Sequence, residues 1–392
     1  MSQKSRATSN LQHILSDLEM RTPGGAAEKW DNVGLLVGDA HSKQKIPGAV
    51  LSIDLTRESI EMAKRLRYPL IVNHHPCIFP KSRGISSVCS EGAGELVFEA
   101  AKAGIAVVST HTNFDKCALE VPGAVAKALG FKAVGRLFEG GEAEFVKLVV
   151  FVPTSHFEKV RDAVCAAGAG KTGRYDTCTF STEGEGTFRG EEGARPFLGQ
   201  VGKLERAREV RLETVFPRGI KKRVLAAMRA AHPYEEIAYD LYRVEQDPSV
   251  VGLVSGLGYG VYGDFEKALP FEEVARRVEK AFGISGFLLT EPVPKRLKRI
   301  GFVAGKGASF VRSAGRVGCD LFITGEAGYH VAREGANDGV AVMEIGHRES
   351  EVFFLRTVER WCREWGIRAK VLNTPVQSMR TSRALGTSRS GL

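Results

Sequence analysis

The stretch Pro69-Leu70-Ile71-Val72-Asn73-His74-His75 joins a short apolar run directly to a pair of histidines. Amphipathic helical patterns alternate with similar apolar runs, which recur at 49–53, 105–108, 299–304, 321–323 and 340–343. Strands that are apolar on both faces and alternate with helices are typical of a buried, largely parallel sheet. We therefore expect an α/β protein with a three-layer core, in which one such sheet lies between layers of helices.

The order of strands and helices changes after Phe138. From there to residue 244 the patterns run strand, helix, strand, strand, helix, strand, with one of these strands expected in the Gly-rich stretch before Gly202. This β-α-β-β-α-β order is that of a ferredoxin-like unit, a compact α+β module. We therefore predict two halves of an α/β metal-centre domain at 1–138 and 247–378, a ferredoxin-like insert domain at 139–246, and a disordered Ser/Thr/Arg-rich tail at 379–392.

Composition limits the class of protein. The 392 residues are 43% hydrophobic and 26% charged, which is typical of a globular chain of more than one domain. No apolar run reaches the ~20 residues that span a bilayer, and the start of the chain lacks the pattern of a secretion signal. Seven cysteines without a C-x-x-C pair indicate neither a disulfide framework nor a cysteine zinc site. We therefore expect a cytoplasmic protein with reduced thiols and no membrane partner.

The net charge of +9 raises the question of nucleic acid binding. The basic residues, however, are dispersed in short runs without the interleaved aromatic residues that stack on bases. This pattern disfavours nucleic acid as a partner, and it favours the attraction of a phosphate-bearing small molecule.

Metal-favouring side chains directly follow three of the apolar runs, at the point where each predicted strand ends. The carboxyl ends of parallel strands share one edge of a sheet, and sites form at this edge in open α/β sheets. Imidazoles and carboxylates are the ligands that borderline divalent metals prefer. We therefore predict five metal ligands at one edge: His74 and His75 after the first run, Asp115 after the run at 105–108, and His347 and Glu351 after the run at 340–343.

The spacing of these residues favours two ions over one. His347 and Glu351 are four residues apart at a helix start, so their side chains share one face and can meet on one ion. The adjacent His74 and His75 tend to point apart in an extended chain, and two neighbouring ions, each taking one imidazole, resolve this. Asp115 would complete the shell of one ion, and Glu351 would bridge both. Paired ions roughly 3.5–4 Å apart activate a shared water for hydrolysis.

Five groups of residues carry a resemblance to a known family. They are 30–38 (Trp-Asp-Asn-Val-Gly-Leu-Leu-Val-Gly), 73–79 (Asn-His-His-Pro-Cys-Ile-Phe), 111–115, 324–326 with Tyr329 and His330, and 346–351. Over nearly its whole length the chain resembles the dinuclear metal-centre proteins called GTP cyclohydrolase I type 2 homologues, or NGG1-interacting-factor-like proteins. The resemblance implies the same five metal ligands. It also implies a middle insert similar to the PII and CutA-type fold, and ring-shaped hexamers built as trimers of dimers.

The sequence leaves two interpretations open for several further residues. His111 either serves the site, by orienting a ligand or by transferring a proton as a catalytic residue, or is structural. His330 either contacts the substrate as a catalytic residue or packs at the surface. The turn at 305–307 either cradles an anion with its amides or is simply a tight turn. The segment at 232–236 either reaches over the metal cleft or forms a structural turn, and Trp30-Asp31-Asn32 either lines the pocket entrance or packs.

We therefore interpret the chain as a dinuclear metal-binding protein that hydrolyses a nucleotide-like small molecule, as the name GTP cyclohydrolase implies. The expected cofactors are two divalent ions (Zn, Mn, Fe or Co). A non-catalytic metal carrier or regulatory binding protein is the alternative, because the modules that the insert resembles sense small molecules or metals. Two residues depart from the family pattern, Glu326 in place of the usual Asp and Lys306 within the turn at 305–307. Neither is expected to touch a ligand, so both bear on substrate contacts rather than on metal binding.

Overall fold

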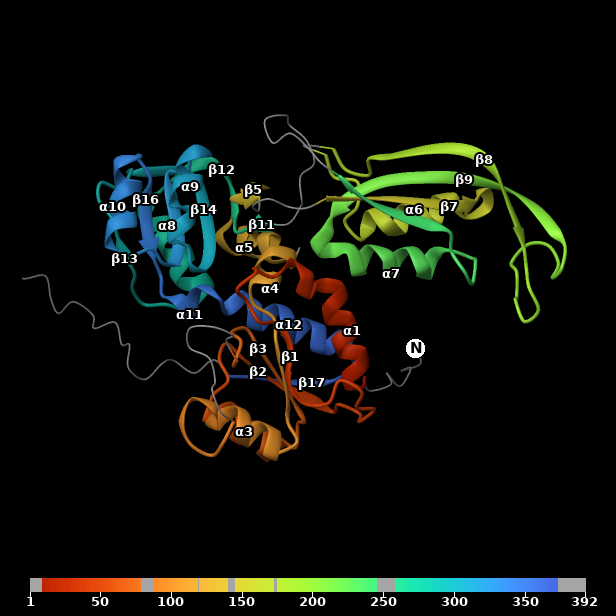
Figure 1. The fold of residues 1–392 in the computed structure, drawn as a ribbon. Helices are drawn as coiled ribbons and strands as arrows, with labels where there is room; N and C mark the ends of the chain where they lie inside the picture. The colour runs from red at the N-terminus through yellow and green to blue at the C-terminus, as the bar shows by residue number, and fades with distance from the viewer. Residues whose placement is uncertain are drawn as a thin grey trace, which may run out of the picture.

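The computed structural model describes residues 9–78, 88–118, 120–139, 145–172, 175–244 and 258–372. Three large sheets organise these residues: two mixed sheets with helices on both faces, and an antiparallel sheet carried to one side of them (Figure 1). The predicted tail at 379–392 lies outside the described residues. No helix in the described part of the chain combines the length and the apolar character needed to cross a membrane. All seven cysteines are free thiols.

The first sheet has the strand order β1-β4-β3-β2-β17, and only β1 runs antiparallel to its neighbour. Its strands are β1 (Gly34–Val37), β2 (Gly48–Ser52), β3 (Leu70–Asn73), β4 (Ala106–Ser109) and β17 (Arg368–Val371). One face is covered by α1 (Leu11–Arg21) and α12 (Val352–Glu364), and the other by α2 (Arg57–Leu66) and α3 (Glu95–Lys102). Ile71 and Val72 are therefore both fully buried on opposite faces, which explains the continuous apolar runs.

The second sheet has the strand order β13-β16-β15-β14-β12-β5. Three of its strands are parallel to one another: β14 (Arg296–Lys306), β15 (Leu321–Glu326) and β16 (Ala341–Glu344). The others pair antiparallel and are β5 (Lys132–Gly135), β12 (Val261–Pro270) and β13 (Leu288–Leu289). One face is covered by α5 (Glu120–Leu129) and α8 (Phe271–Phe282), and the other by α9 (Val311–Arg316) and α10 (Tyr329–Asn337).

The expectation of a single sheet behind all three metal-favouring stretches is wrong. Two of the stretches follow β3 and β4 of the first sheet, whereas the third follows β16 of the second. The sequence patterns did not indicate β12, a strand of ten residues. It pairs antiparallel with β14, and both belong to the second sheet, which is separate from the first. The helix α12 packs between the two sheets, because its Phe353 joins the core of the second and its Phe354 that of the first. The carboxyl ends of β3, β4 and β16 thus meet at a junction.

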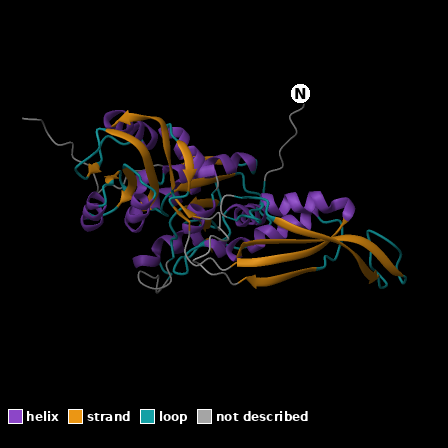
Figure 2. Ribbon diagram, turned by 90° about the horizontal axis from the view of Figure 1, so that it is seen from above, coloured by secondary structure: helices purple, strands orange, loops and turns teal. Residues whose placement is uncertain are grey.

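The third sheet is antiparallel and has the strand order β10-β7-β9-β8. Along the chain its elements are β7 (Phe145–Pro153), α6 (Phe157–Ala166), β8 (Thr179–Arg189), β9 (Leu204–Pro217), α7 (Lys221–Ala231) and β10 (Tyr239–Val244). The helices α6 and α7 cover one face, and the hairpin of β8 and β9 extends beyond them, away from the two mixed sheets (Figures 1 and 2). Two short strands, β6 (Phe138–Glu139) and β11 (Gly258–Tyr259), pair where the chain enters and leaves this part of the fold.

Candidate metal centre

His74 directly follows β3 and is a buried imidazole whose proton has a defined place. Its side chain is 1% exposed, and its Nδ1 lies 2.9 Å from the carbonyl oxygen of Thr110. Because a carbonyl oxygen only accepts, Nδ1 carries the proton and Nε2 keeps a lone pair. This Nε2 lies 3.7 Å from both Asp115 Oδ1 and Glu351 Oε1. Burial lowers the pKa of His74 to about 3, so the ring is neutral at neutral pH, which is the form that binds metals.

His75 lies between two carboxylates. Its Nδ1 is 2.8 Å from Asp54 Oδ1, and its Nε2 is 3.2 Å from Glu351 Oε2. Burial alone would lower the pKa of His75, but the hydrogen bonds to Asp54 and Glu351 raise it to about 10. The sequence patterns above did not single out Asp54. It follows β2 as His74 follows β3, so the same rule of strand ends would have found it.

His111 precedes α4 (Thr112–Cys117) and contacts a fully buried aspartate. Its Nδ1 lies 3.0 Å from Asp31 Oδ1. Burial would raise the pKa of Asp31, but the hydrogen bond and charge of His111, together with further hydrogen bonds, lower it to about 2. The ionised Asp31 thus fixes the orientation of the His111 ring. The ring centroids of His74 and His75 lie 5.1 and 5.4 Å from that of His111, so all three imidazoles share one site.

Glu351 lies at the centre of the cluster, between the two sheets. It follows α11 (His347–Ser350) and its side chain is 3% exposed. Its Oε1 is 3.2 Å from His347 Nε2 and 3.4 Å from His75 Nε2. The spacing of four residues therefore brings His347 and Glu351 together, as predicted, although α11 ends between them. Burial would raise the pKa of Glu351, but the surrounding histidines His74, His347 and His75 lower it.

The second oxygen of Glu351 lies 3.2 Å from His75 Nε2, but not in hydrogen-bond geometry. Its Oε2 is buried and makes no hydrogen bond to the described residues. A buried carboxylate oxygen that has lost water and makes no hydrogen bond is only partly compensated by a neighbouring imidazole. The atom therefore marks a place where a cation would be stabilised.

Asp115 is brought to the same cluster from α4. Its Oδ1 lies 3.7 Å from His74 Nε2. The side chain is 24% exposed, so Asp115 lies at the edge of the cluster rather than at its centre. Burial raises the pKa of Asp115 to about 7, because the carboxylate loses water in its charged form. A cation beside it would reverse this shift.

Two glycines make room for α11. A Cβ on Gly325 would lie 2.8 Å from the Cα of His347, and a Cβ on Gly305 would lie 2.9 Å from Glu351 Oε1. Of the turn expected at 305–307, Gly305 and Lys306 are instead the last residues of β14, and this strand end reaches the cluster with its backbone. Its first amide is already used, because Gly305 N–H donates to Ser350 Oγ at 2.8 Å. This hydrogen bond gives the strand end a structural role beside the site. On the neighbouring β15, Glu326 Oε1 lies 3.4 Å from His347 Nδ1, so the expectation that Glu326 touches no ligand is wrong.

The Gly305→Ala variant is expected to be less stable and to bind metal less tightly. The backbone at Gly305 is left-handed (φ +66°), which costs an alanine about 1–2 kcal/mol, and the added methyl group would press on Glu351. Gly318→Ala is a matched control, because Gly318 is also left-handed (φ +73°) but has no atom within 4 Å of its Cβ position. Denaturant unfolding and metal titration compare the two variants. Equal metal affinity in both would contradict the close approach to Glu351.

The donor atoms form two overlapping groups. Those of His74, His75 and His111 lie within 4.8 Å of one another, and so do those of His75, His347 and Glu351. Imidazoles and carboxylates at this spacing suit Zn, Mn, Fe or Co. Together with the unbonded Oε2 of Glu351, this donor set fits divalent metal binding. His111, for which a supporting role was predicted, lies as close to the histidine pair as a ligand would.

The sequence and the fold both match one family. The family model for Duf34/NIF3 (NGG1p interacting factor 3) matches residues 9–378, which include every residue of the cluster. The chain belongs to the Duf34/NIF3 family. This confirms the resemblance that the five groups of residues indicated.

Relatives of this Duf34/NIF3 chain match it over most of their own length. The GTP cyclohydrolase 1 type 2 homolog of Bacillus subtilis is 35% identical over 343 residues, which cover 88% of this chain and 89% of that protein. The homolog of the same name from Halalkalibacterium halodurans is 34% identical over 344 residues, covering 88% and 90%. The crystal structure of a Bacillus cereus protein related to NIF3 is similar to this fold with a TM-score of 0.72 and 29% identity, covering 96% of this chain and 100% of that chain.

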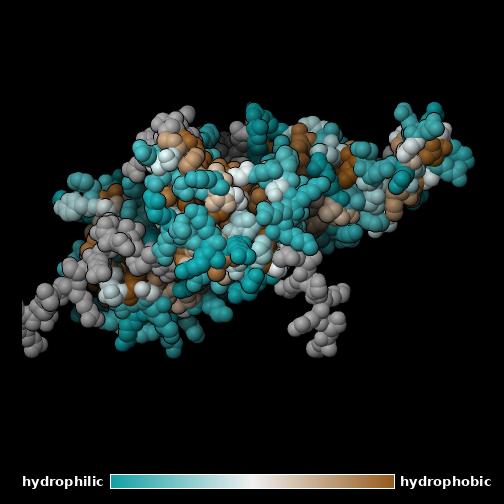
Figure 3. All heavy atoms as spheres, turned by 90° about the horizontal axis from the view of Figure 1, so that it is seen from below, coloured by the Kyte–Doolittle hydropathy of each residue, from teal (hydrophilic) through white to brown (hydrophobic). Residues whose placement is uncertain are grey.

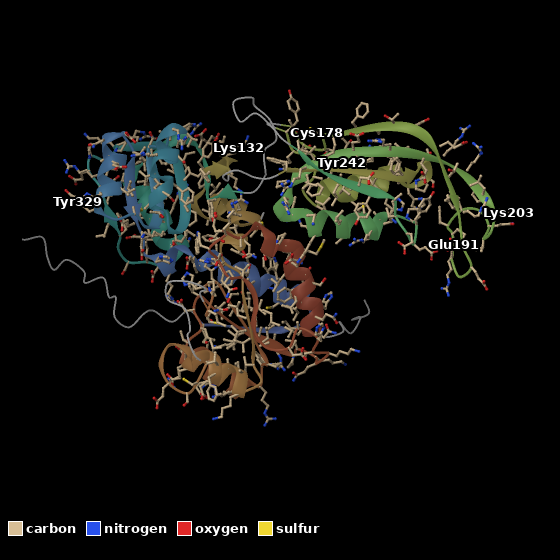
Figure 4. The ribbon with its side chains drawn as sticks, viewed as in Figure 1. Lys132, Cys178, Glu191, Lys203, Tyr242 and Tyr329 are labelled. Atoms are coloured by element: carbon tan, nitrogen blue, oxygen red, sulfur yellow. The ribbon has the colours of Figure 1, made fainter. Side chains whose placement is uncertain are left out.

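The remaining predicted residues lie at different distances from the cluster. Trp30 is at its rim, since its ring is 58% exposed and its centroid is 5.9 Å from that of His111. His330 is exposed on α10 and contacts Tyr329, which projects from the outer side of the second sheet (Figure 4). No described contact joins His330 to the cluster. His232 is buried in the third sheet's core, where its Nε2 lies 3.0 Å from Phe151 O, so the segment at 232–236 is a structural turn there.

Proposed function

We propose that this Duf34/NIF3 protein binds two divalent metal ions in the cluster and hydrolyses a nucleotide-like small molecule. The observation that carries the proposal is Glu351, a buried carboxylate at the junction of two sheets with histidines around both oxygens and no hydrogen bond to Oε2. Zn, Mn, Fe or Co would be held by His74, His75, Asp115, His347 and Glu351. When bound, such ions polarise substrate oxygens and lower the pKa of coordinated water.

His111 is the residue that would move a proton. If its Nδ1–H donates to the ionised Asp31, its Nε2 is left as an acceptor, which is the arrangement of a histidine base oriented by a carboxylate. His330 was also predicted to act on the substrate, but its position on α10 gives it no described contact with His111. We therefore assign proton transfer to His111.

Two features support a nucleotide-like substrate. The exposed ring of Trp30 beside His111 offers a surface on which a planar heterocycle can stack. The net charge of +9 attracts phosphate-bearing molecules. The relatives named GTP cyclohydrolase 1 type 2 homolog agree with a substrate of this class.

A substrate screen tests the reaction. The full-length protein is loaded in turn with Mn, Zn, Fe and Co and incubated with a panel of nucleotides that includes GTP, and products are separated by chromatography. We expect turnover that a chelator abolishes and that the added metal restores. A protein that holds its metal but turns over none of these nucleotides with any of the four ions would contradict hydrolysis of a nucleotide.

The His111→Ala variant is expected to keep its metal and lose its activity. Removing a general base lowers kcat by about 10²–10⁴-fold, whereas the five ligands remain in place. The measurements are kcat and the metal content from elemental analysis, with His41→Ala, an exposed histidine outside the cluster, as the control. Loss of an ion together with activity would make His111 a ligand and would remove it as the proton carrier.

A metal carrier is the second candidate function. His347, one of the proposed ligands, has a side chain that is 34% exposed, so an ion bound there lies close to solvent. The rate of metal transfer to a competing chelator separates the two functions. Transfer within seconds without catalytic turnover favours a carrier, whereas retention over hours with turnover favours an enzyme.

We also propose that residues 139–246 form a ferredoxin-like domain of the PII/CutA type that assembles the chain into a hexamer. Its strand order, with α6 and α7 on one face, supports this fold. The register places Phe180 and Tyr242 on the face that these helices leave open, where they are 66% and 51% exposed (Figure 4 labels Tyr242). Apolar residues are also exposed where the β8–β9 hairpin ends, which appears brown in Figure 3: Phe197, Leu198, Val201 and Leu204.

Sedimentation of the full-length protein at micromolar concentration tests the assembly. We expect a particle with six times the chain mass of 42.6 kDa, because exposed apolar surface of this kind is stable when buried between copies. A particle with the mass of one chain would contradict the hexamer. Such a result would not affect the proposal for the metal centre, because all of its residues come from one chain.

A further inference from the structure

A second cavity lies at the opposite edge of the first sheet from the metal cluster. It has a volume of about 770 Å3 and is lined by residues that directly precede three strands, Pro47 before β2, Pro69 before β3 and Ile105 before β4. The cluster follows the other ends of β3 and β4. At the rise of a β-strand, four residues separate the two edges by on the order of 13 Å. The cavity is therefore a separate site, of the size that small ligands occupy.

The lining of this cavity is basic and includes no acidic residue. Three cationic side chains line it, those of Lys45, Lys64 and Arg67. Lys64 Nζ lies 2.9 Å from Glu61 Oε1 and 3.7 Å from Glu99 Oε2, so its charge is largely compensated. Within the described part of the chain, neither Lys45 nor Arg67 has an acidic partner. Their uncompensated charge at a concave surface attracts anions.

The backbone of Arg67 has a conformation that is unfavourable for arginine. It caps α2 with φ 54° and ψ 43°, the left-handed region in which glycine is favoured. The corresponding cap of α8 is Gly283. Among the described residues other than glycine, only Thr177 shares a positive φ.

The dipole of α2 does not explain this choice of residue. Basic side chains near a helix C-terminus are stabilising, but Lys64 and Arg65 already supply this charge from the last turn. A glycine at position 67 would relieve the backbone and leave both of them in place. An arginine kept in a strained conformation at the wall of a cavity indicates a role for its side chain there.

We propose that this cavity binds a small ligand with two or more phosphate groups. The Arg67 guanidinium would hold one phosphate group through two parallel hydrogen bonds, and Lys45 would hold the next as a point charge. Lys64 would add charge at the same wall. The site is independent of the metal centre and of the reaction that it carries out.

Calorimetric titration with inorganic pyrophosphate tests the proposal. The titration uses the full-length protein, both as purified and after removal of divalent ions by a chelator, so that pyrophosphate bound through metal is recognised. The variants are Arg67→Gly and Lys45→Ala. The control is Lys159→Ala, which removes an exposed lysine from α6. Thermal unfolding of each variant is measured beside the titration.

We expect saturable binding that persists after chelation. Arg67→Gly should weaken it at least tenfold while Tm stays equal or rises, because glycine relieves the left-handed backbone. Lys45→Ala should weaken it with an unchanged Tm, and Lys159→Ala should have no effect. Binding that disappears on chelation, or that both cavity variants retain in full, would overturn the proposal. So would the absence of saturable binding to the wild-type protein.

Discussion

Glu351→Gln is expected to yield a protein that folds but carries little or no divalent metal. The change keeps the size of the side chain and removes the charge at the centre of the cluster, where Oε1 lies 3.2 Å from His347 Nε2 and Oε2 lies 3.2 Å from His75 Nε2. Removing one member of a buried, charged group costs about 3–5 kcal/mol. We expect a loss of metal affinity of about that size, which is roughly two to four orders of magnitude.

The control for this variant is Glu349→Gln, the same substitution two residues earlier. Glu349 lies on α11 but contacts Arg348 rather than the cluster, so its charge is not used to hold metal. Elemental analysis of both proteins after the same purification gives the comparison. If Glu351→Gln retained as much metal as Glu349→Gln, the carboxylate of Glu351 could not be the bridge between the two groups of histidines.

Phe354→Ala is expected to damage both the fold and the site. Phe354 is 2% exposed on α12, and its ring centroid lies 4.8 Å from that of His74 and 5.1 Å from that of Phe114. Truncating a buried phenylalanine to alanine lowers the free energy of unfolding by about 3–5 kcal/mol. The cavity would also let water reach His74, whose neutral form depends on burial. We therefore expect a lower Tm together with weaker metal binding.

The conservative variant separates packing from a special role of the aromatic ring. Phe354→Leu keeps an apolar side chain in the same place, and swaps of this kind usually cost less than about 1.5 kcal/mol. Thermal unfolding and metal titration of both variants are the measurements. A Phe354→Ala protein as stable as Phe354→Leu would show that the junction between the sheets does not depend on this residue.

The local sequence predicted the strand ends and the residue types that follow them. Runs such as Leu70–Asn73 are recognisable because both faces of the first sheet are covered, so nearly every position is apolar. The same pattern placed His74 and His75 at an edge, and the spacing of four residues brought His347 to Glu351. Each of these inferences concerns only a few neighbouring residues, for which strand burial patterns and helical spacing are reliable guides.

The partition into two sheets could not be predicted in the same way. A buried strand such as β16 has the same apolar pattern whichever sheet it joins, because its pattern reports burial and not its partner. The division depends on β12, whose burial alternates and then becomes exposed, so its signal is weak. It also depends on α12, whose Phe353 and Phe354 face different sheets. Such long-range pairing is decided by packing between segments far apart in sequence.

The partners of the ligands were also beyond the sequence patterns. Asp54 supports His75, and Asp31 supports His111 from a segment eighty residues earlier. A carboxylate in a loop is common, and nothing in its neighbours shows which histidine it will meet. The strand end that precedes Asp54 offered one signal, and the stretch 30–32, considered as a lining of the pocket entrance, offered a weaker one for Asp31. The proton on His74 is fixed by the backbone carbonyl of Thr110. Because every residue has such a carbonyl, no sequence pattern could have revealed this contact.

X-ray diffraction from metal-loaded crystals, recorded at the absorption edge of the bound ion, tests the central claim most directly. We expect two anomalous peaks at the junction of the two sheets, with His74, His75 and Asp115 from the first and His347 and Glu351 from the second as ligands. A single peak would remove the paired centre. Peaks elsewhere, with these five side chains unliganded, would contradict the metal site altogether.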